Sequence, residues 1–222
     1  NNIIISRGLL HICGLTLHQR LSLQKKLSVA ETRALALQLL AALVAIGERG
    51  IVHRDVKPEN LMLGVTANGE VQLKLVDFGI ALVHEASFAA RLTQHGALVG
   101  TPHYMAPEQL RCELTDARAD LYAAGVVMYQ ALTGVMPYDG SDFPSLTINV
   151  LNGKARALRA LCPECPRALA RVIERALERE PEHRFPDARS MLEALAASDE
   201  RASARDSARE TLRSLGHRAR RL

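Results

Sequence analysis

Tryptophan is absent from these 222 residues, and aromatic side chains make up only 4% of them. Proteins that bind single-stranded nucleic acids usually stack the bases on aromatic rings, so this composition argues against such a platform. Long apolar runs are also missing: the longest, Leu35 to Ile46, is too short to cross a bilayer and includes Gln38. We therefore expect no membrane span, and we find no signal-peptide pattern.

Cysteine is scarce as well, with four residues in the whole chain. So few cysteines do not form a disulfide framework in a chain of this length. Cys162 and Cys165 make a lone C-x-x-C pair, whereas structural zinc sites normally use four ligands. We interpret the pair as two reduced thiols on a loop, and this cysteine usage predicts a cytoplasmic protein.

The net charge of +4 is unevenly distributed. Residues 199–222 contain seven arginines against four acidic residues, so this tail supplies +3 of the total. Four of the arginines recur at every fourth position and would form a stripe on a helix: Arg201, Arg205, Arg209 and Arg213. Asp206 and Glu210 dilute that stripe. A solvated end or linker is the favoured interpretation; a tail that binds nucleic acid or membrane is the alternative. We expect no nucleic-acid partner for the rest of the chain.

A long helix is predicted near residue 30. Ser28 and Glu31 have the spacing of a capping box, and leucines, alanines and valines continue to about Arg49. Gly50 supplies a stop signal. Because apolar residues nearly encircle this helix, we expect it in the core.

The next segment predicts a β-hairpin. Residues 61–63 are apolar, residues 70–76 alternate between apolar and polar, and Asn68-Gly69 between them favours a tight turn. Residues 77–108 have little periodicity and predict a long functional loop. Further helices are expected over 115–132, 145–151, 167–177 and 186–196. The predicted fold class is therefore mainly α with a small β-hairpin.

Three motifs follow one another in this frame. Residues 53–60 read His-Arg-Asp-Val-Lys-Pro-Glu-Asn, residues 77–79 read Asp-Phe-Gly, and residues 106–108 read Ala-Pro-Glu. In order and spacing they resemble the catalytic loop, the magnesium loop and the end of the activation segment of protein kinases. Lys57, followed by Pro58 and Glu59, and the segment from Gly100 to Glu108 resemble serine/threonine kinases rather than tyrosine kinases. Leu92-Thr93-Gln94, followed by Gly100-Thr101, resembles the bacterial type of these kinases. The resemblance implies a protein-kinase-like C-lobe.

The resemblance also implies an activity, in which the γ-phosphate of ATP passes to Ser or Thr hydroxyls of a protein substrate with Mg²⁺ bound, Mn²⁺ being the alternative metal. By this likeness Asp55 orients the substrate hydroxyl and Lys57 contacts the transferring phosphate. Asn60 and Asp77 match the magnesium ligands and offer the hard oxygens that this cation prefers. Thr101 matches the threonine that bonds the catalytic aspartate and lysine.

Arg54 has a regulatory counterpart in the family. An arginine before the catalytic aspartate commonly binds a phosphate on the activation loop, and a guanidinium suits that role. Ser87 and Thr93 are the candidate acceptors, and Thr93 is preferred. A solvated loop threonine is the equally weighted alternative.

Three further positions match structural residues of the family. Asp120 resembles the buried aspartate that holds the catalytic-loop backbone. Glu108 and Arg184 resemble a buried ion pair between the activation segment and the late helices. An ordinary exposed aspartate is the alternative for Asp120, and the apolar run that follows it makes this alternative less attractive.

Some motifs of the family have no match here. We find no glycine-rich phosphate loop, no strand lysine and no helix glutamate to pair with it. The sequence therefore predicts residues 1–13 as a hinge or N-lobe remnant, 14–197 as the kinase C-lobe and 198–222 as an Arg-rich tail or linker. We expect residues 1–222 alone to be inactive for lack of the N-lobe. A non-catalytic truncated kinase that serves as an interaction module is the alternative.

Overall fold

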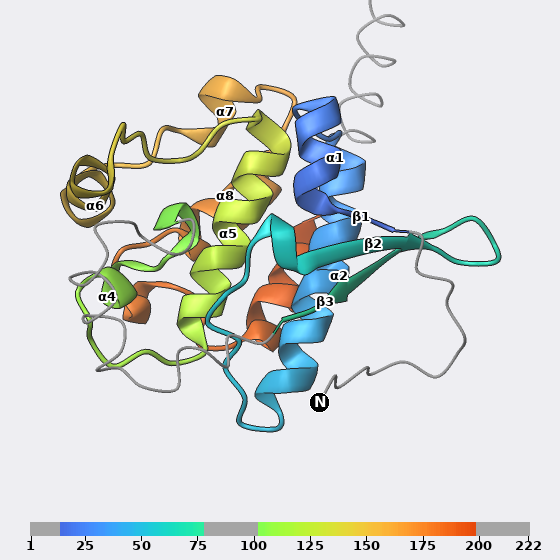
Figure 1. Ribbon diagram of the computed structural model, residues 1–222, viewed down its shortest axis with the longest axis horizontal. Coiled ribbons are helices and arrows are strands. Elements are labelled where there is room, and N and C mark those ends of the chain that lie inside the picture. The colour runs from blue at the N-terminus through green and yellow to red at the C-terminus, as the bar shows by residue number, and fades with distance from the viewer. Residues whose placement is uncertain (1–13, 78–101, 199–222) are drawn as a thin grey trace, which may run out of the picture.

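The computed structural model describes residues 14–77 and 102–198. These residues are mostly helical, with one antiparallel sheet of three strands (Figure 1). Short 3-10 helices cover Pro58–Asn60, Pro102–Tyr104 and Pro181–His183. The strands and α-helices are β1 (Leu15–Thr16), α1 (Leu17–Gln24), α2 (Val29–Gly47), β2 (Leu61–Val65), β3 (Val71–Leu75), α4 (Pro107–Leu110), α5 (Arg118–Thr133), α6 (Phe143–Asn152), α7 (Leu158–Leu161) and α8 (Arg167–Ala176), and a last helix spans 188–198.

Helix α2 begins as predicted. The Ser28 hydroxyl accepts the Glu31 backbone N–H, and the Glu31 carboxylate accepts the Ser28 N–H. In the described part of the chain, α2 is the one helix long and apolar enough to cross a membrane, and its 19 residues exceed the apolar run seen in the sequence. A core helix meets the same criterion: Leu39, Leu40 and Leu43 are buried, and α2 packs against α5 and β3.

The predicted hairpin is confirmed and extended. β2 pairs with β3 in the register Leu63 opposite Leu73, and Gly69 in the connecting turn has a φ of 81°, a value that glycine adopts without strain. The sequence predicted only these two strands, but the sheet has a third: β1 pairs antiparallel with β2. Strands of two residues carry almost no sequence pattern, so alternation could not reveal β1.

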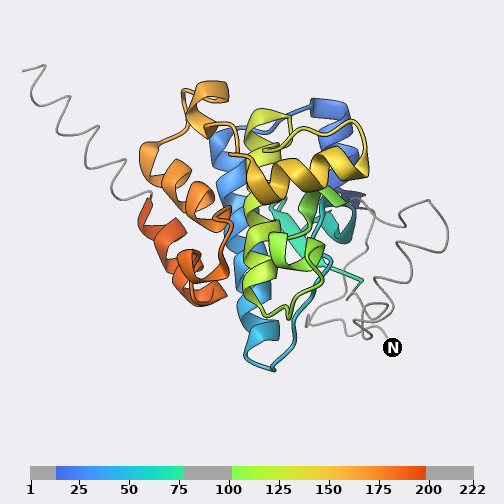
Figure 2. The same ribbon diagram turned by 90° about the vertical axis from the view of Figure 1, so that its left-hand side faces the viewer.

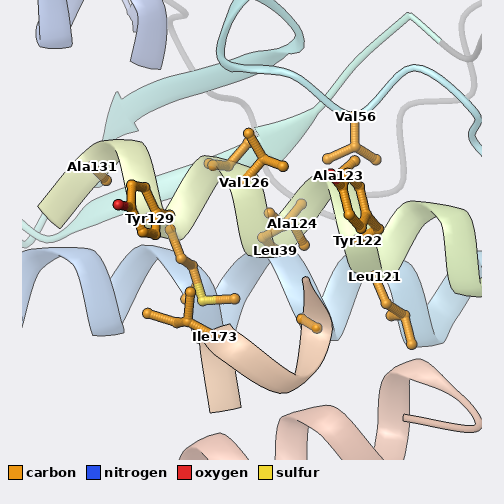
Figure 3. Packing of buried hydrophobic residues seen from close by; sticks show 14 of the residues in the cluster. Leu39, Val56, Leu121, Tyr122, Ala123, Ala124, Val126, Tyr129, Ala131 and Ile173 are labelled. Atoms are coloured by element: carbon orange, nitrogen blue, oxygen red, sulfur yellow. The ribbon is translucent and has the colours of Figure 1, made fainter. Parts of the chain in front are cut away.

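Helix α5 forms the centre of the molecule, between α2 and α8 (Figures 1 and 2). Nearly every residue from Ala119 to Leu132 is buried, and apolar side chains from both neighbouring helices pack on it (Figure 3). At Gly125 a Cβ would come within 2.9 Å of the Ala176 Cβ, so glycine allows α8 to approach closely. An all-round apolar helix of this kind belongs in a protein core.

The later helices largely follow their predicted ranges. α5 starts three residues later than expected, ends at Thr133 and is capped by Gly134, while α6 is longer than predicted by two residues at its start and one at its end. The predicted loop over 77–108 lies mostly outside the described residues, and its final part already enters α4. Helix α1 was not predicted. Its capping box, Thr16 with Gln19, was the signal available in the sequence.

Candidate active site

The loop between α2 and β2 carries the motif of residues 53–60, and this loop packs on helix α5. Val56 is buried, and its side chain points toward Ala123 and Tyr122 of α5 (Figure 3). The Asp120 carboxylate accepts the backbone N–H of His53 and that of Arg54, each at 2.7 Å. A buried carboxylate that is fully hydrogen-bonded in this way fixes a loop firmly, because breaking either bond would leave a buried group unpaired.

The pKa of Asp120 is raised to about 6 because the side chain is buried, and the two backbone N–H groups partly oppose this effect. Each carboxylate oxygen nevertheless accepts a backbone N–H, which is the pattern expected of the ionised form. The structure thus excludes an exposed helical aspartate at this position.

His53 connects this loop to the strand that precedes the second motif. Its Nδ1 accepts the Asp55 N–H at 3.3 Å, so Nε2 carries the proton and donates to the Val76 carbonyl at 3.2 Å. Burial lowers the pKa of His53, which keeps the ring neutral in this tautomer. Sequence reasoning gave His53 no role of its own.

The Asp55 carboxylate lies beside two other predicted residues. Its Oδ2 accepts an N–H from the Asn60 amide at 2.9 Å and lies 2.8 Å from Lys57 Nζ. The Asn60 amide also donates to the Asp55 carbonyl at 2.8 Å. The structure therefore brings Asp55, Lys57 and Asn60 together, with the carboxylate held in one orientation by charge-assisted bonds.

Asp77 follows the end of β3 and lies near the loop that carries Asp55 and Asn60. The Val76 N–H donates to the Asn60 carbonyl at 2.9 Å, so the end of β3 lies against the 3-10 helix that carries Asn60. Asp77 adopts a φ of 56°, in the left-handed region that asparagine and aspartate visit most readily after glycine. The negative charge of Asp77 also opposes the lowering of the His53 pKa, as expected of a nearby carboxylate.

This donor set fits magnesium. Mg²⁺ is usually bound by one or two carboxylates together with water and substrate phosphates, and Asp77 with the amide oxygen of Asn60 offers that chemistry. Among residues 14–77 and 102–198, no cluster of three or more His, Cys, Asp or Glu side chains could hold a metal by itself. Within the same ranges, Cys112, Cys162 and Cys165 form no disulfide.

A buried ion pair fixes helix α4. Arg184 binds the Glu108 carboxylate through two parallel bonds of 2.7 Å, and both side chains are buried. The guanidinium also donates to the carbonyls of Glu178 and Arg179 and to that of Arg118. The predicted pairing of Glu108 with Arg184 thus has the bidentate geometry that makes arginine suitable for buried sites.

Gln109 was not predicted as a functional residue. Its side-chain amide accepts the Ala106 N–H and donates to the Arg54 carbonyl. The sequence signal was weak: a glutamine at the third position of a helix, where a capping box can form. Thr101, Thr93 and Ser87 lie outside the described residues, so their predicted roles stay predictions.

Comparison with known proteins now identifies the fold. The family described as "Protein kinase domain" matches residues 9–198. The chain belongs to the protein kinase family. A crystal structure of the Mycobacterium tuberculosis PknI kinase domain is similar, with a TM-score of 0.63 and 27% identity over 85% of this chain and 64% of that one.

Curated bacterial relatives support the predicted resemblance. This kinase chain is 40% identical to serine/threonine-protein kinase pkn2 of Myxococcus xanthus over 78% of its own length and 21% of the relative's. It is 34% identical to pkn3 of the same species, over 89% and 37% of the two chains. It is 30% identical to PrkC of Bacillus subtilis, over 82% and 27%. The prediction of a bacterial-type serine/threonine kinase sequence is confirmed, and the chain spans well under half the length of these relatives.

Replacing Asp120 by asparagine should destabilise the kinase fold. The amide keeps one oxygen for one backbone N–H, but its NH₂ group would face the other donor. We expect a loss of about 1–3 kcal/mol in the free energy of unfolding, measured by urea denaturation. Asp142, the N-cap of α6, is the matched control, because asparagine caps helices as well as aspartate does. Equal effects of D120N and D142N would contradict the assigned role of Asp120.

Proposed function

We propose that this chain provides the catalytic loop of a serine/threonine protein kinase that transfers the γ-phosphate of ATP to protein hydroxyls. The observation that carries the proposal is the Asp55 carboxylate, oriented by Lys57 and Asn60 on a loop that Asp120 anchors from the core. Phosphoryl transfer depends mainly on positioning and charge stabilisation, and this arrangement supplies both.

Each side chain then has a distinct task. Asp55 accepts a hydrogen bond from the substrate hydroxyl and aims it at the phosphate, a role for which an ionised carboxylate is suited. Lys57 contributes positive charge beside Asp55, where the transferred group would carry negative charge. Asn60 and Asp77 would hold Mg²⁺, which supplies charge neutralisation at the nucleotide phosphates when bound.

We also propose that residues 14–197 correspond to the large helical lobe of the kinase fold. The buried Asp120, the Glu108–Arg184 pair and the small sheet beside the loop support this assignment. The flanking assignments, residues 1–13 as a hinge or N-lobe remnant and 198–222 as a tail, stay predictions. A cytoplasmic location, a protein substrate and the regulatory role of Thr93 with Arg54 are part of the same proposal.

A phosphotransfer assay tests the proposal. The full-length gene product, incubated with radiolabelled ATP, Mg²⁺ and casein, is expected to yield phosphoserine or phosphothreonine, and EDTA should remove the signal. Residues 1–222 alone are expected to give no signal above background, because they contain no match to the family's phosphate-positioning lysine.

Two outcomes would change this interpretation. A full-length product that transfers no phosphate with Mg²⁺ present would contradict the proposed activity and favour the alternative, a kinase-like module that binds other proteins. Robust Mg²⁺-dependent transfer by residues 1–222 alone, lost on Asp55→Asn, would instead show that the site in this chain needs no further residues.

A further inference from the structure

The side-chain amide of Gln109 contacts two separate segments of the chain. Its Oε1 accepts the Ala106 N–H at 2.9 Å, which caps the first turn of α4. Its Nε2 donates to the Arg54 carbonyl at 3.3 Å, 55 positions earlier in the sequence. The first bond is local to the helix, whereas the second connects α4 to the loop that carries Asp55.

The Arg54 carbonyl belongs to the peptide unit that ends at the Asp55 nitrogen. Asp55 donates its N–H to His53 Nδ1, so Gln109 and His53 hold the two polar groups of this one peptide unit. Arg54 has a φ of 64°, a sparsely populated conformation for any residue other than glycine. Such a conformation persists only where its surroundings hold it in place.

Helix α4 is itself a fixed support. Glu108, next to Gln109 in sequence, is buried and bound through two bonds to Arg184. Gln109 therefore projects from a helix that cannot move without breaking a buried ion pair.

We propose that Gln109 is a positioning residue, which fixes the Arg54–Asp55 peptide relative to α4 and thereby sets the direction of the Asp55 carboxylate. The inference rests on the proposed function, in which Asp55 orients the substrate hydroxyl. Gln109 links the segment after the activation loop to the catalytic loop through the Arg54 backbone carbonyl, independently of the Arg54 side chain.

The substitution Gln109→Glu tests this directly. A glutamate keeps an oxygen for the Ala106 N–H but offers no donor to the Arg54 carbonyl. Gln19→Glu is a matched control, because Gln19 accepts the Thr16 N–H at 2.9 Å in the capping box of α1. In residues 1–222, hydrogen exchange of the Asp55 amide should become about tenfold faster in Q109E and stay unchanged in Q19E.

Kinetics of the full-length gene product give the second measurement. In Q109E, kcat should fall about tenfold while the KM for ATP stays within about twofold, since nucleotide contacts are untouched. An unchanged Asp55 amide would overturn the inference, as would equal acceleration of amides in β2 and β3, which would indicate general destabilisation. If the wild type transfers no phosphate, the proposed function fails, and the exchange data alone still decide whether Gln109 holds this peptide.

Discussion

Asp55→Asn is expected to lower kcat of the full-length kinase by about 100-fold or more. Asparagine cannot accept the hydroxyl proton as a carboxylate does. Its amide would also disturb the surroundings, because Asp55 Oδ2 now faces two donors, the Asn60 amide and the Lys57 ammonium. If the asparagine NH₂ group took the place of Oδ2, it would face these two donors. If the amide turned the other way, its oxygen would face the donors and its NH₂ group, rather than an oxygen, would face the substrate. Steady-state kinetics with casein at saturating Mg²⁺ and ATP would measure the loss.

The KM for ATP should change little in the same variant, because Asn60 and Asp77 remain to hold the metal. Asp139→Asn is a matched control: Asp139 is exposed, pairs with Arg156 at 2.9 Å and loses the same charge in an equivalent substitution. Its kcat should equal that of the wild type. If D55N retained full activity, the assignment of Asp55 as the residue that orients the hydroxyl would be wrong.

Arg184→Met is expected to lower the free energy of unfolding by about 3–5 kcal/mol. The substitution leaves the Glu108 carboxylate buried without its partner, and it also removes the bonds from the guanidinium to three backbone carbonyls. A buried charge that loses its partner pays a desolvation penalty that nothing compensates. Urea denaturation followed by circular dichroism would measure the change.

A surface ion pair provides the contrast. Arg189 pairs with Glu48 where both side chains are more than half exposed, so Arg189→Met should cost only about 0–1 kcal/mol. The double variant R184M/E108L should recover part of the loss, because it removes the uncompensated charge. Equal stabilities of R184M and R189M would contradict the idea that the Glu108–Arg184 pair anchors α4.

Local features of the fold were predictable because their causes lie within a few residues. The capping box of α2 needs only Ser28 and Glu31, three positions apart, and the hairpin turn needs only Asn68 and Gly69. Strand β1 was missed because two residues show no alternation, and it forms only because β2 offers it a free edge. The order and spacing of the three motifs were enough to indicate the kinase family.

The sequence by itself determined which residue types are available for phosphoryl transfer and which helices carry capping signals. The family resemblance also indicated the contact of Asp120 with the loop and that of Glu108 with Arg184, but the tertiary structure decides their geometry and adds the contact of Gln109. Asp120 binds backbone groups 66 and 67 positions away, Glu108 meets Arg184 across 76 positions, and Gln109 reaches the Arg54 carbonyl across 55. The physical reason is that buried polar groups must be satisfied by whatever partners folding brings beside them, and no periodicity along the chain encodes that proximity.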